Sequence, residues 1–154
     1  MKDYIKTKIG NLYIWFRYRK YLQFHHSCHI SRNCVFEGAN KIYPNTLFEG
    51  YLGYGSYIGA NCEIRANIDR FTSIAPYVRT NSGIHPTTTP YATTCPMFFS
   101  TRKQNGNSFA DKMMFVEAKR RPHIGNDVWI GENVFIGGGK YWRRCSRLCR
   151  CCCN

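Results

Sequence analysis

The chain has 154 residues, of which 44% are hydrophobic and 13 are glycines, and a formal net charge of +13. This length suits one hydrophobic core, so we expect a single domain with a single site. The basic residues are scattered and match no nucleic-acid-binding motif, so we expect no nucleic-acid partner.

Residues 1–27 are predicted to form a partly helical extension. Ile5, Ile9, Leu12 and Trp15 recur at near-helical spacing, which indicates a short amphipathic helix that packs on the body, with a membrane surface as the alternative contact. No apolar stretch is long enough for a signal peptide or a membrane span. We therefore expect a cytoplasmic protein, or one peripheral to the membrane, in which the nine cysteines form no disulfides.

A group of potential metal ligands follows this extension: His25, His26, Cys28, His29 and Cys34. Their spacing fits no zinc pattern. Cys28, Cys34 and later Cys62 instead occupy inward positions of a six-residue repeat, where small apolar side chains belong. The sequence therefore predicts core cysteines and no metal.

The six-residue repeat extends over residues 28–139. Its aliphatic positions include Leu52, Ile58 and Ile64, then Ile124, Ile130 and Ile136; a second set comprises Ser56, Cys62, Ile68 and Ile74, and a weaker copy comprises Ile30, Phe36 and Ile42. A period of six suits a short strand followed by a tight turn, and it predicts a coil of stacked parallel strands. The repeat changes phase around residues 43–51, where we expect an irregular turn or small excursion.

Two segments of the repeat carry a family resemblance. IGANCEIRANIDRFTSIAP and HIGNDVWIGENVFIGGG resemble the hexapeptide-repeat acyltransferases, which fold as left-handed triangular β-helices. HPTTTPYATTCPMFF and NDVWIGENV resemble, more narrowly, the branch that contains polysaccharide O-acetyltransferases and the streptogramin and chloramphenicol acetyltransferases. The resemblance covers residues 28–139. It implies an all-β, left-handed parallel β-helix, acetyl-coenzyme A as co-substrate, no metal, and a homotrimer at full length.

A long excursion over residues 86–122 interrupts the repeat and is rich in Thr, Asn, Lys and aromatic residues. Repeat proteins place such insertions over their binding faces, so we expect a protruding functional loop. His85 lies where the repeat ends and the loop begins. The resemblance makes His85 the general base that deprotonates an acceptor hydroxyl during attack on a thioester. A histidine that caps a turn is the alternative.

Other candidate residues lie on both sides of this loop. Asn81 and Ser82 are close enough in sequence to orient an acceptor or His85. Trp129, Asn126 and Gly131 match the family segment along the pantetheine arm of the coenzyme, although Asn126 and Gly131 equally suit turn positions. Residues 119–121, Lys-Arg-Arg, are either contacts for coenzyme phosphates or an ordinary solvated run.

These features predict a coenzyme A-dependent O-acetyltransferase that modifies a sugar hydroxyl of a surface polysaccharide precursor. A hydroxylated antibiotic is the alternative acceptor. A metal hydratase resembling the γ-class carbonic anhydrases is a second enzyme class, but it requires three zinc histidines, and the repeat region offers no convincing third beside His85 and His123. A scaffold or inactive truncated remnant is the non-catalytic alternative.

Residues 140–154, KYWRRCSRLCRCCCN, break the repeat abruptly. Cysteine codons read one base later encode only Ala or Val, and with permitted codons the segment becomes NIGDGAVVCAGAVVT, which again has a six-residue repeat. We therefore expect a shifted reading frame that has truncated the enzyme, with a cysteine-rich metal or redox tail as the alternative. The chain as written is then expected to be aggregation-prone and poor in acetyl transfer, because its last coil would be exposed.

Sequencing the DNA that encodes residues 140–154 tests this expectation. Read one base later, it should contain aliphatic-Gly hexads and an open frame beyond Asn154. A shifted frame without such hexads would leave the cysteine-rich segment as the true sequence.

Overall fold

The computed structural model describes residues 2–81, 83–118, 120–137 and 140–141, with side chains from Lys8 to Gly137 within these ranges. The chain forms two bodies. One contains the described residues up to Asn81 and from Arg121 on, and the other contains those from Gly83 to Arg120. The second body thus corresponds to the segment that interrupts the repeat.

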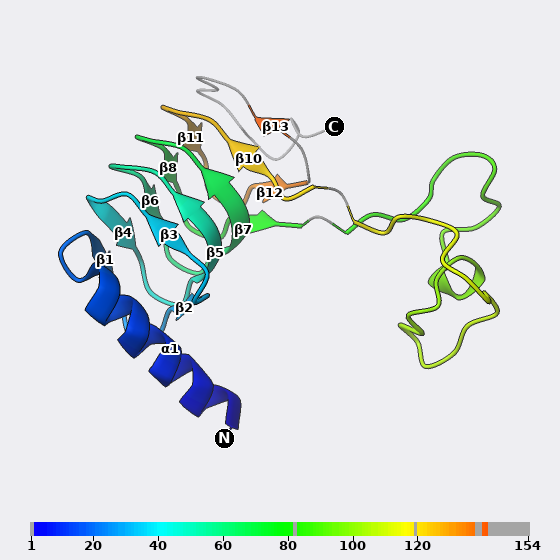
Figure 1. Ribbon diagram of the computed structural model, residues 1–154. Helices are drawn as coiled ribbons and strands as arrows, with labels where there is room; N and C mark the ends of the chain where they lie inside the picture. The colour runs from blue at the N-terminus through cyan, green and yellow to red at the C-terminus, as the bar shows by residue number, and fades with distance from the viewer. Residues whose placement is uncertain (1, 82, 119, 138–139, 142–154) are drawn as a thin grey trace. The chain divides into compact units, whose positions relative to one another are not determined.

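Among its described residues, the first body contains one helix and a series of short strands (Figure 1). The elements in chain order are α1 (Lys2–Tyr18), β1 (Leu22–Phe24), β2 (His29–Ile30), β3 (Val35–Phe36), β4 (Asn40–Ile42), β5 (Leu47–Leu52), β6 (Tyr57–Ile58), β7 (Glu63–Ile68), β8 (Ser73–Ile74), β9 (Arg79–Thr80), β10 (His123–Ile124), β11 (Trp129–Ile130), β12 (Phe135–Ile136) and β13 (Lys140–Tyr141). The second body contains a 3₁₀ turn at Pro96–Phe98.

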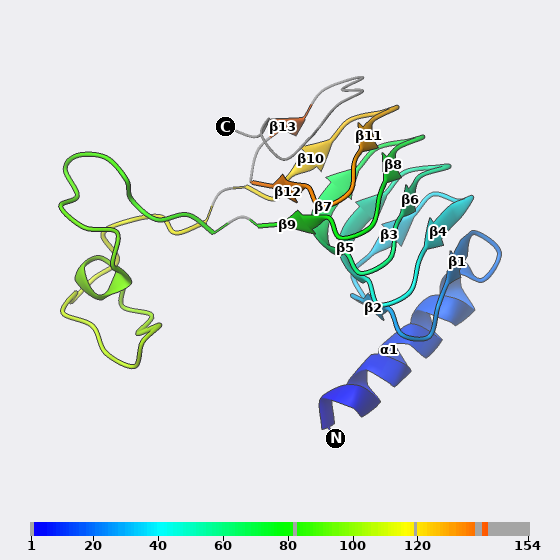
Figure 2. The same ribbon diagram turned by 180° about the vertical axis from the view of Figure 1, so that it is seen from behind.

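The strands wind into a parallel β-helix, in which each strand pairs with its counterpart in the next coil (Figures 1 and 2). One ladder runs β1, β4, β6, β8 and β11; another contains β12, β9, β7, β10 and β13, with β5 pairing to β2, β3 and β7. The all-β parallel β-helix predicted from the repeat is thereby confirmed, whereas its left hand stays a prediction of the family resemblance. Parallel pairing continues into β13, the first two residues of the segment predicted to be aberrant.

The length of a coil changes along the β-helix. Leu22 pairs with Asn40, so the first coil takes 18 residues, whereas Tyr57 pairs with Ser73, so a later coil takes 16. The shorter coils contain the six-residue strands β5 and β7, whose residues alternate between buried and less buried along their whole length. A coil turns at three corners, and β5 and β7 each run through one of them, called the third corner here, without a separate turn. At this corner four residues, instead of six, separate one inward aliphatic residue from the next.

This four-residue step corrects two details of the predicted repeat. The phase change at residues 43–51 is not an excursion but the entry into β5, a continuous strand. The grouping of Ile68 and Ile74 with Ser56 and Cys62 is also wrong, because Ile74 pairs with Ile58 across adjacent coils. Ile68 likewise lies between Leu52 and Ile124 in the ladder. All of these aliphatic residues therefore occupy equivalent inward positions.

The core consists of inward stacks that run through successive coils. One stack contains Ile42, Ile58, Ile74 and Ile130, and another contains Leu52, Ile68 and Ile124; all are fully buried or nearly so. Burying one such side chain contributes about 1.5–3 kcal/mol. Because each coil buries its apolar residues against the next, the stack is stable as a unit and a single coil is not.

Small residues occupy the second inward position of several hexads. Cys28, Cys34 and Cys62 are buried there, as predicted. Burial raises the pKa of all three thiols, because a thiolate would lose its hydration in the core. Ser56 and Thr72 occupy related positions and satisfy their hydroxyls through backbone groups, with Ser56 donating to the Asp69 carbonyl at 2.7 Å. These residues thus stabilise the core in their neutral forms.

Two of the corners depend on residues with a left-handed backbone. Asn45, Asn61, Tyr77 and Asn133 form one column of such residues, with φ between 57° and 60°. The third corner instead requires Gly50, whose φ is 142°. A Cβ atom at Gly50 would lie 2.0 Å from the carbonyl oxygen of Ala66 in the next coil. Only glycine fits this close approach between two backbones.

The helix α1 packs on the first coil with a different face from the one predicted. Ile9, Leu12 and Trp15 are exposed, whereas Ile14 is fully buried and Asn11 is nearly so. The spacing of Ile9, Leu12 and Trp15 was consistent with a helix but did not show which face turns inward. Asn11 decides the orientation, because its amide donates to the carbonyl of Cys28 at 2.7 Å.

We predict that Gly50→Ala destabilises the fold by about 2–4 kcal/mol, because strain at φ 142° adds to the clash with Ala66. Urea unfolding followed by circular dichroism measures the change. Gly10→Ala is the control: its Cβ would meet nothing closer than 3.9 Å and it lies within α1, so its stability should be equal or slightly higher. Equal stability of Gly50→Ala and the wild-type chain would contradict the interpretation of the third corner.

Candidate functional site

The residues predicted to form the site are divided between the two bodies. Asn81, Asn126, Trp129 and Gly131 belong to the β-helix, His85 belongs to the second body, and Ser82 lies outside the described residues.

His85 is exposed, and one hydrogen bond fixes its ring. Its Nδ1 lies 2.8 Å from the carbonyl oxygen of Thr94. A carbonyl oxygen can only accept a hydrogen bond, so Nδ1 carries the proton and Nε2 of the neutral ring keeps its lone pair. This tautomer suits a general base, because Nε2 can then accept a proton from a hydroxyl.

A small aromatic core supports the imidazole from within the second body. Phe99 is 1% exposed, and its ring lies perpendicular to that of His85 with centroids 6.0 Å apart. Tyr91 and Phe115 pack edge-on against Phe99 at 6.4 and 5.7 Å. The segment that interrupts the repeat is therefore a packed structure, and His85 lies at the edge of its core.

A polar network around Glu117 holds the two arms of the same body together. The hydroxyl of Ser100 donates to the Glu117 carboxylate at 2.8 Å, and the guanidinium of Arg102 lies 3.4 Å from it. The backbone carbonyl of Glu117 accepts a hydrogen bond from the N–H of Ile84 at 2.9 Å. Because Ile84 precedes His85, this bond ties the backbone beside the imidazole to the returning arm.

Trp129 lies on the outer surface of the β-helix, in β11. It pairs in register with Ser73, which pairs with Tyr57, so three outward residues follow one another along this face. The indole is about half exposed. A flat aromatic surface of this kind is suited to contact a ligand or another subunit.

The other predicted residues of the β-helix have structural contacts. The side-chain oxygen of Asn126 accepts a hydrogen bond from the backbone N–H of Arg70 at 3.1 Å, which holds two stacked corners together. The backbone N–H of Asn81 donates to the carbonyl of Ile136 at 2.9 Å. Gly131 directly follows β11 and is partly buried. Asn126 thus has the turn role that the sequence left open for it.

The structure describes two residues of the basic run 119–121, and these two belong to different bodies. Lys119 lies outside the described residues, and Arg120 is an exposed residue of the second body. The guanidinium of Arg121 forms an ion pair with Glu49 in the first body. Arg121 therefore already has a carboxylate partner.

The structure also reveals a His–Asp pair that sequence reasoning missed. Nε2 of His123 lies 2.9 Å from the carboxylate of Asp69, and both side chains are partly exposed. A carboxylate only accepts, so Nε2 of His123 donates and carries the proton, unlike Nε2 of His85. The two residues are 54 positions apart. The coil register could have predicted their proximity, because β10 pairs with β7 when the excursion is left out of the residue count.

A charged group at the neighbouring corner involves Glu37, Arg70 and Tyr51. Two nitrogens of the Arg70 guanidinium contact the two Glu37 oxygens at 2.7 and 2.9 Å, and this pairing lowers the pKa of Glu37 to about 2. Burial, followed by a hydrogen bond to Glu37, raises the pKa of Tyr51 to about 12. These shifts favour an ionised carboxylate and a neutral phenol, so the group links coils and offers no base near neutral pH.

The described residues contain neither a metal-binding cluster nor a membrane-spanning helix. No three His, Cys, Asp or Glu side chains in this part of the chain lie close enough to hold a metal ion together. Within the same residues, no helix has both the length and the apolar character needed to cross a bilayer.

Comparison with protein-family models, curated proteins and solved structures finds no match for this chain.

Proposed function

We propose that the protein is an O-acetyltransferase that moves an acetyl group from acetyl-coenzyme A to a hydroxyl of a sugar, with His85 as the general base. One observation carries the proposal: the carbonyl of Thr94 holds Nδ1 of His85 at 2.8 Å and so leaves Nε2 as the proton acceptor. The parallel β-helix and the family resemblance of its repeats support the same reaction, although fold alone does not determine function.

His85 acts in both halves of the transfer. The acceptor hydroxyl gives its proton to Nε2 as its oxygen attacks the thioester carbonyl carbon. The tetrahedral intermediate then collapses, the carbon–sulfur bond breaks, and the imidazolium returns the proton to the departing thiolate. The products are an O-acetyl ester and coenzyme A, and His85 ends in its starting state. The Thr94 carbonyl keeps the ring oriented, and the contact with Phe99 limits its rotation.

The outward face of β11 is the proposed wall for the pantetheine arm of the coenzyme. Trp129 offers an exposed indole there, and Asn126 fixes the corner that precedes it. Asn81 remains the proposed acceptor-orienting residue, since it precedes His85 by one short segment of chain. By the family resemblance, the active assembly is a homotrimer.

The acceptor could instead be a hydroxylated antibiotic, because a general base of this kind deprotonates either hydroxyl. An inactive remnant is the remaining alternative.

One experiment distinguishes these possibilities. It uses two forms of the protein, the wild-type chain and a version whose residues 140–154 are translated in the shifted frame, and each form is incubated with acetyl-coenzyme A. Free thiol release is measured with nucleotide sugars, simple glycosides, chloramphenicol or a streptogramin as acceptor. Release with none of them, in either form, would favour the remnant.

We predict that His85→Ala lowers acetyl transfer by about 10²- to 10⁴-fold while leaving coenzyme A binding nearly unchanged, because only the proton acceptor is lost. Steady-state thiol release gives the rate, and calorimetry gives the affinity for coenzyme A. The measurement uses whichever of the two forms is active.

His123→Ala is the matched control, since it removes an imidazole from the β-helix whose Nε2 donates to Asp69. Its rate should stay within a few-fold of the parent. Near-normal turnover of His85→Ala, or an equal loss in both variants, would remove His85 from the mechanism.

A further inference from the structure

The helix α1 is fixed to the first coil by one face. Ile14 is fully buried there, and the hydroxyl of Tyr18 donates to the carbonyl of Cys34 at 3.3 Å. The Tyr18 ring also packs edge-on against Phe36 at 5.1 Å. Together with the hydrogen bond from Asn11 to Cys28, these contacts set the rotation of α1 about its axis.

The opposite face of α1 is apolar and exposed. Leu12 is 55% exposed and Phe16 is 65% exposed, and Ile9 lies about one turn before Leu12 on the same face. Tyr13 and Trp15 flank this row and are about half exposed. A surface helix of a globular protein normally turns polar residues outward, so a contiguous apolar row here indicates a binding surface.

Basic residues are frequent in the segment that carries this apolar row. Among the first twenty residues, the basic ones are Lys2, Lys6, Lys8, Arg17, Arg19 and Lys20, against a single acid, Asp3. Of these, Lys8, Arg17, Arg19 and Lys20 are exposed. The surface therefore combines exposed aliphatic and aromatic side chains with a strong excess of positive charge.

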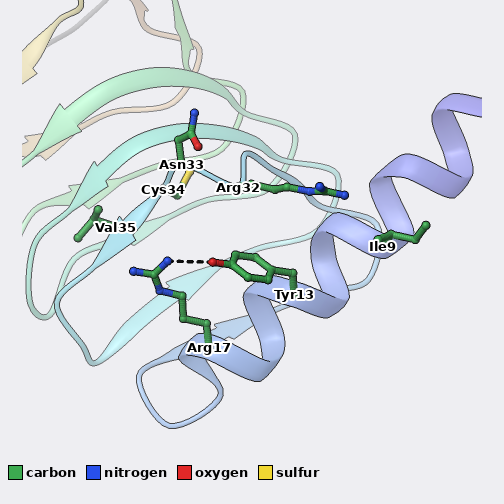
Figure 3. A pocket seen from close by; sticks show the side chains of 7 residues that line it. All are labelled: Ile9, Tyr13, Arg17, Arg32, Asn33, Cys34 and Val35. Carbon is green, nitrogen blue, oxygen red and sulfur yellow. Dashed lines mark hydrogen bonds between the residues drawn. The ribbon is translucent and has the colours of Figure 1, made fainter.

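A groove between α1 and the first coil has the same combination of apolar and basic side chains (Figure 3). It has a volume of about 610 Å³ and is lined by Ile9, Tyr13 and Arg17 of the helix and by residues 32–35 of the coil. The Arg17 guanidinium donates to the Tyr13 hydroxyl at 3.0 Å, and Arg32 extends toward the helix from the opposite side. Two guanidinium groups beside apolar side chains suit a phosphate attached to a hydrophobic chain.

We propose that α1 and this groove dock the protein on the surface of an anionic phospholipid bilayer. Leu12 and Phe16 enter the boundary between headgroups and acyl chains, Tyr13 and Trp15 lie at headgroup level, and Arg17 and Arg32 contact lipid phosphates. Charge favours a membrane over a second copy of this chain, because two surfaces this basic would repel one another. The inference stands apart from the proposed acetyl transfer, since it concerns only α1 and the first coil.

Vesicle flotation with the full chain tests the proposal. The protein should float with phosphatidylcholine vesicles that contain about 30% phosphatidylglycerol, bind vesicles of phosphatidylcholine alone at least about tenfold more weakly, and release as salt rises. Replacing Leu12 and Phe16 by Gln together should weaken binding to the anionic vesicles by about tenfold or more. Circular dichroism should show an unchanged fold, because both side chains face outward.

The matched control replaces Phe109 and Val116 by Gln. These residues are even more exposed, at 69% and 77%, but they belong to the second body. This double variant should bind the anionic vesicles like the wild-type chain.

Three outcomes would overturn the proposal. One is equal binding, or none, to both kinds of vesicle. Another is an equal loss of binding in the two double variants. The third is lipid-free self-association that disappears when Leu12 and Phe16 are replaced, without vesicle binding by the wild-type chain, which would make a second copy the occupant of this surface.

Discussion

The structure depends on the register between coils, which places each inward side chain directly above its counterpart in the next coil. Ile58 pairs with Ile74, and Ile74 with Ile130, although 56 residues separate the last two. The stack tolerates the long excursion because β10 resumes in register with β7. A displacement of one residue would turn the aliphatic side chains outward, so packing fixes the register strongly.

This register also determines where chemistry can be placed. In the coils that contain β5 and β7, two corners are closed by left-handed residues such as Asn61, whereas the third corner is a four-residue step. The chain leaves the β-helix at that third corner, between β9 and β10, and forms a second body with its own core. His85 therefore belongs to a packed unit, in which Phe99 and Thr94 fix its ring.

The sequence predicted the repeat and the burial of its aliphatic residues, because both follow from a period of six. It did not predict the four-residue step, since a continuous strand and an irregular turn give the same phase change. The prediction of which face of α1 turns inward was also wrong. Asn11 is buried because it bonds to the Cys28 carbonyl, and the spacing of apolar residues in the sequence does not reveal such a partner. For the same reason the partners of His85 required coordinates, whereas the Asp69–His123 pair follows from the coil register once the excursion is left out.

The tautomer of His85 is the most direct test of the account, because the proposed base depends on it. Spectra of the ¹⁵N-labelled histidines, recorded where the rings are neutral, distinguish a protonated Nδ1 from a protonated Nε2, and the His85 signals are assigned by their loss in His85→Ala. The account predicts that the neutral His85 ring carries its proton on Nδ1, hydrogen-bonded to Thr94. A proton on Nε2 would contradict it, because the nitrogen proposed to accept the hydroxyl proton would already be occupied.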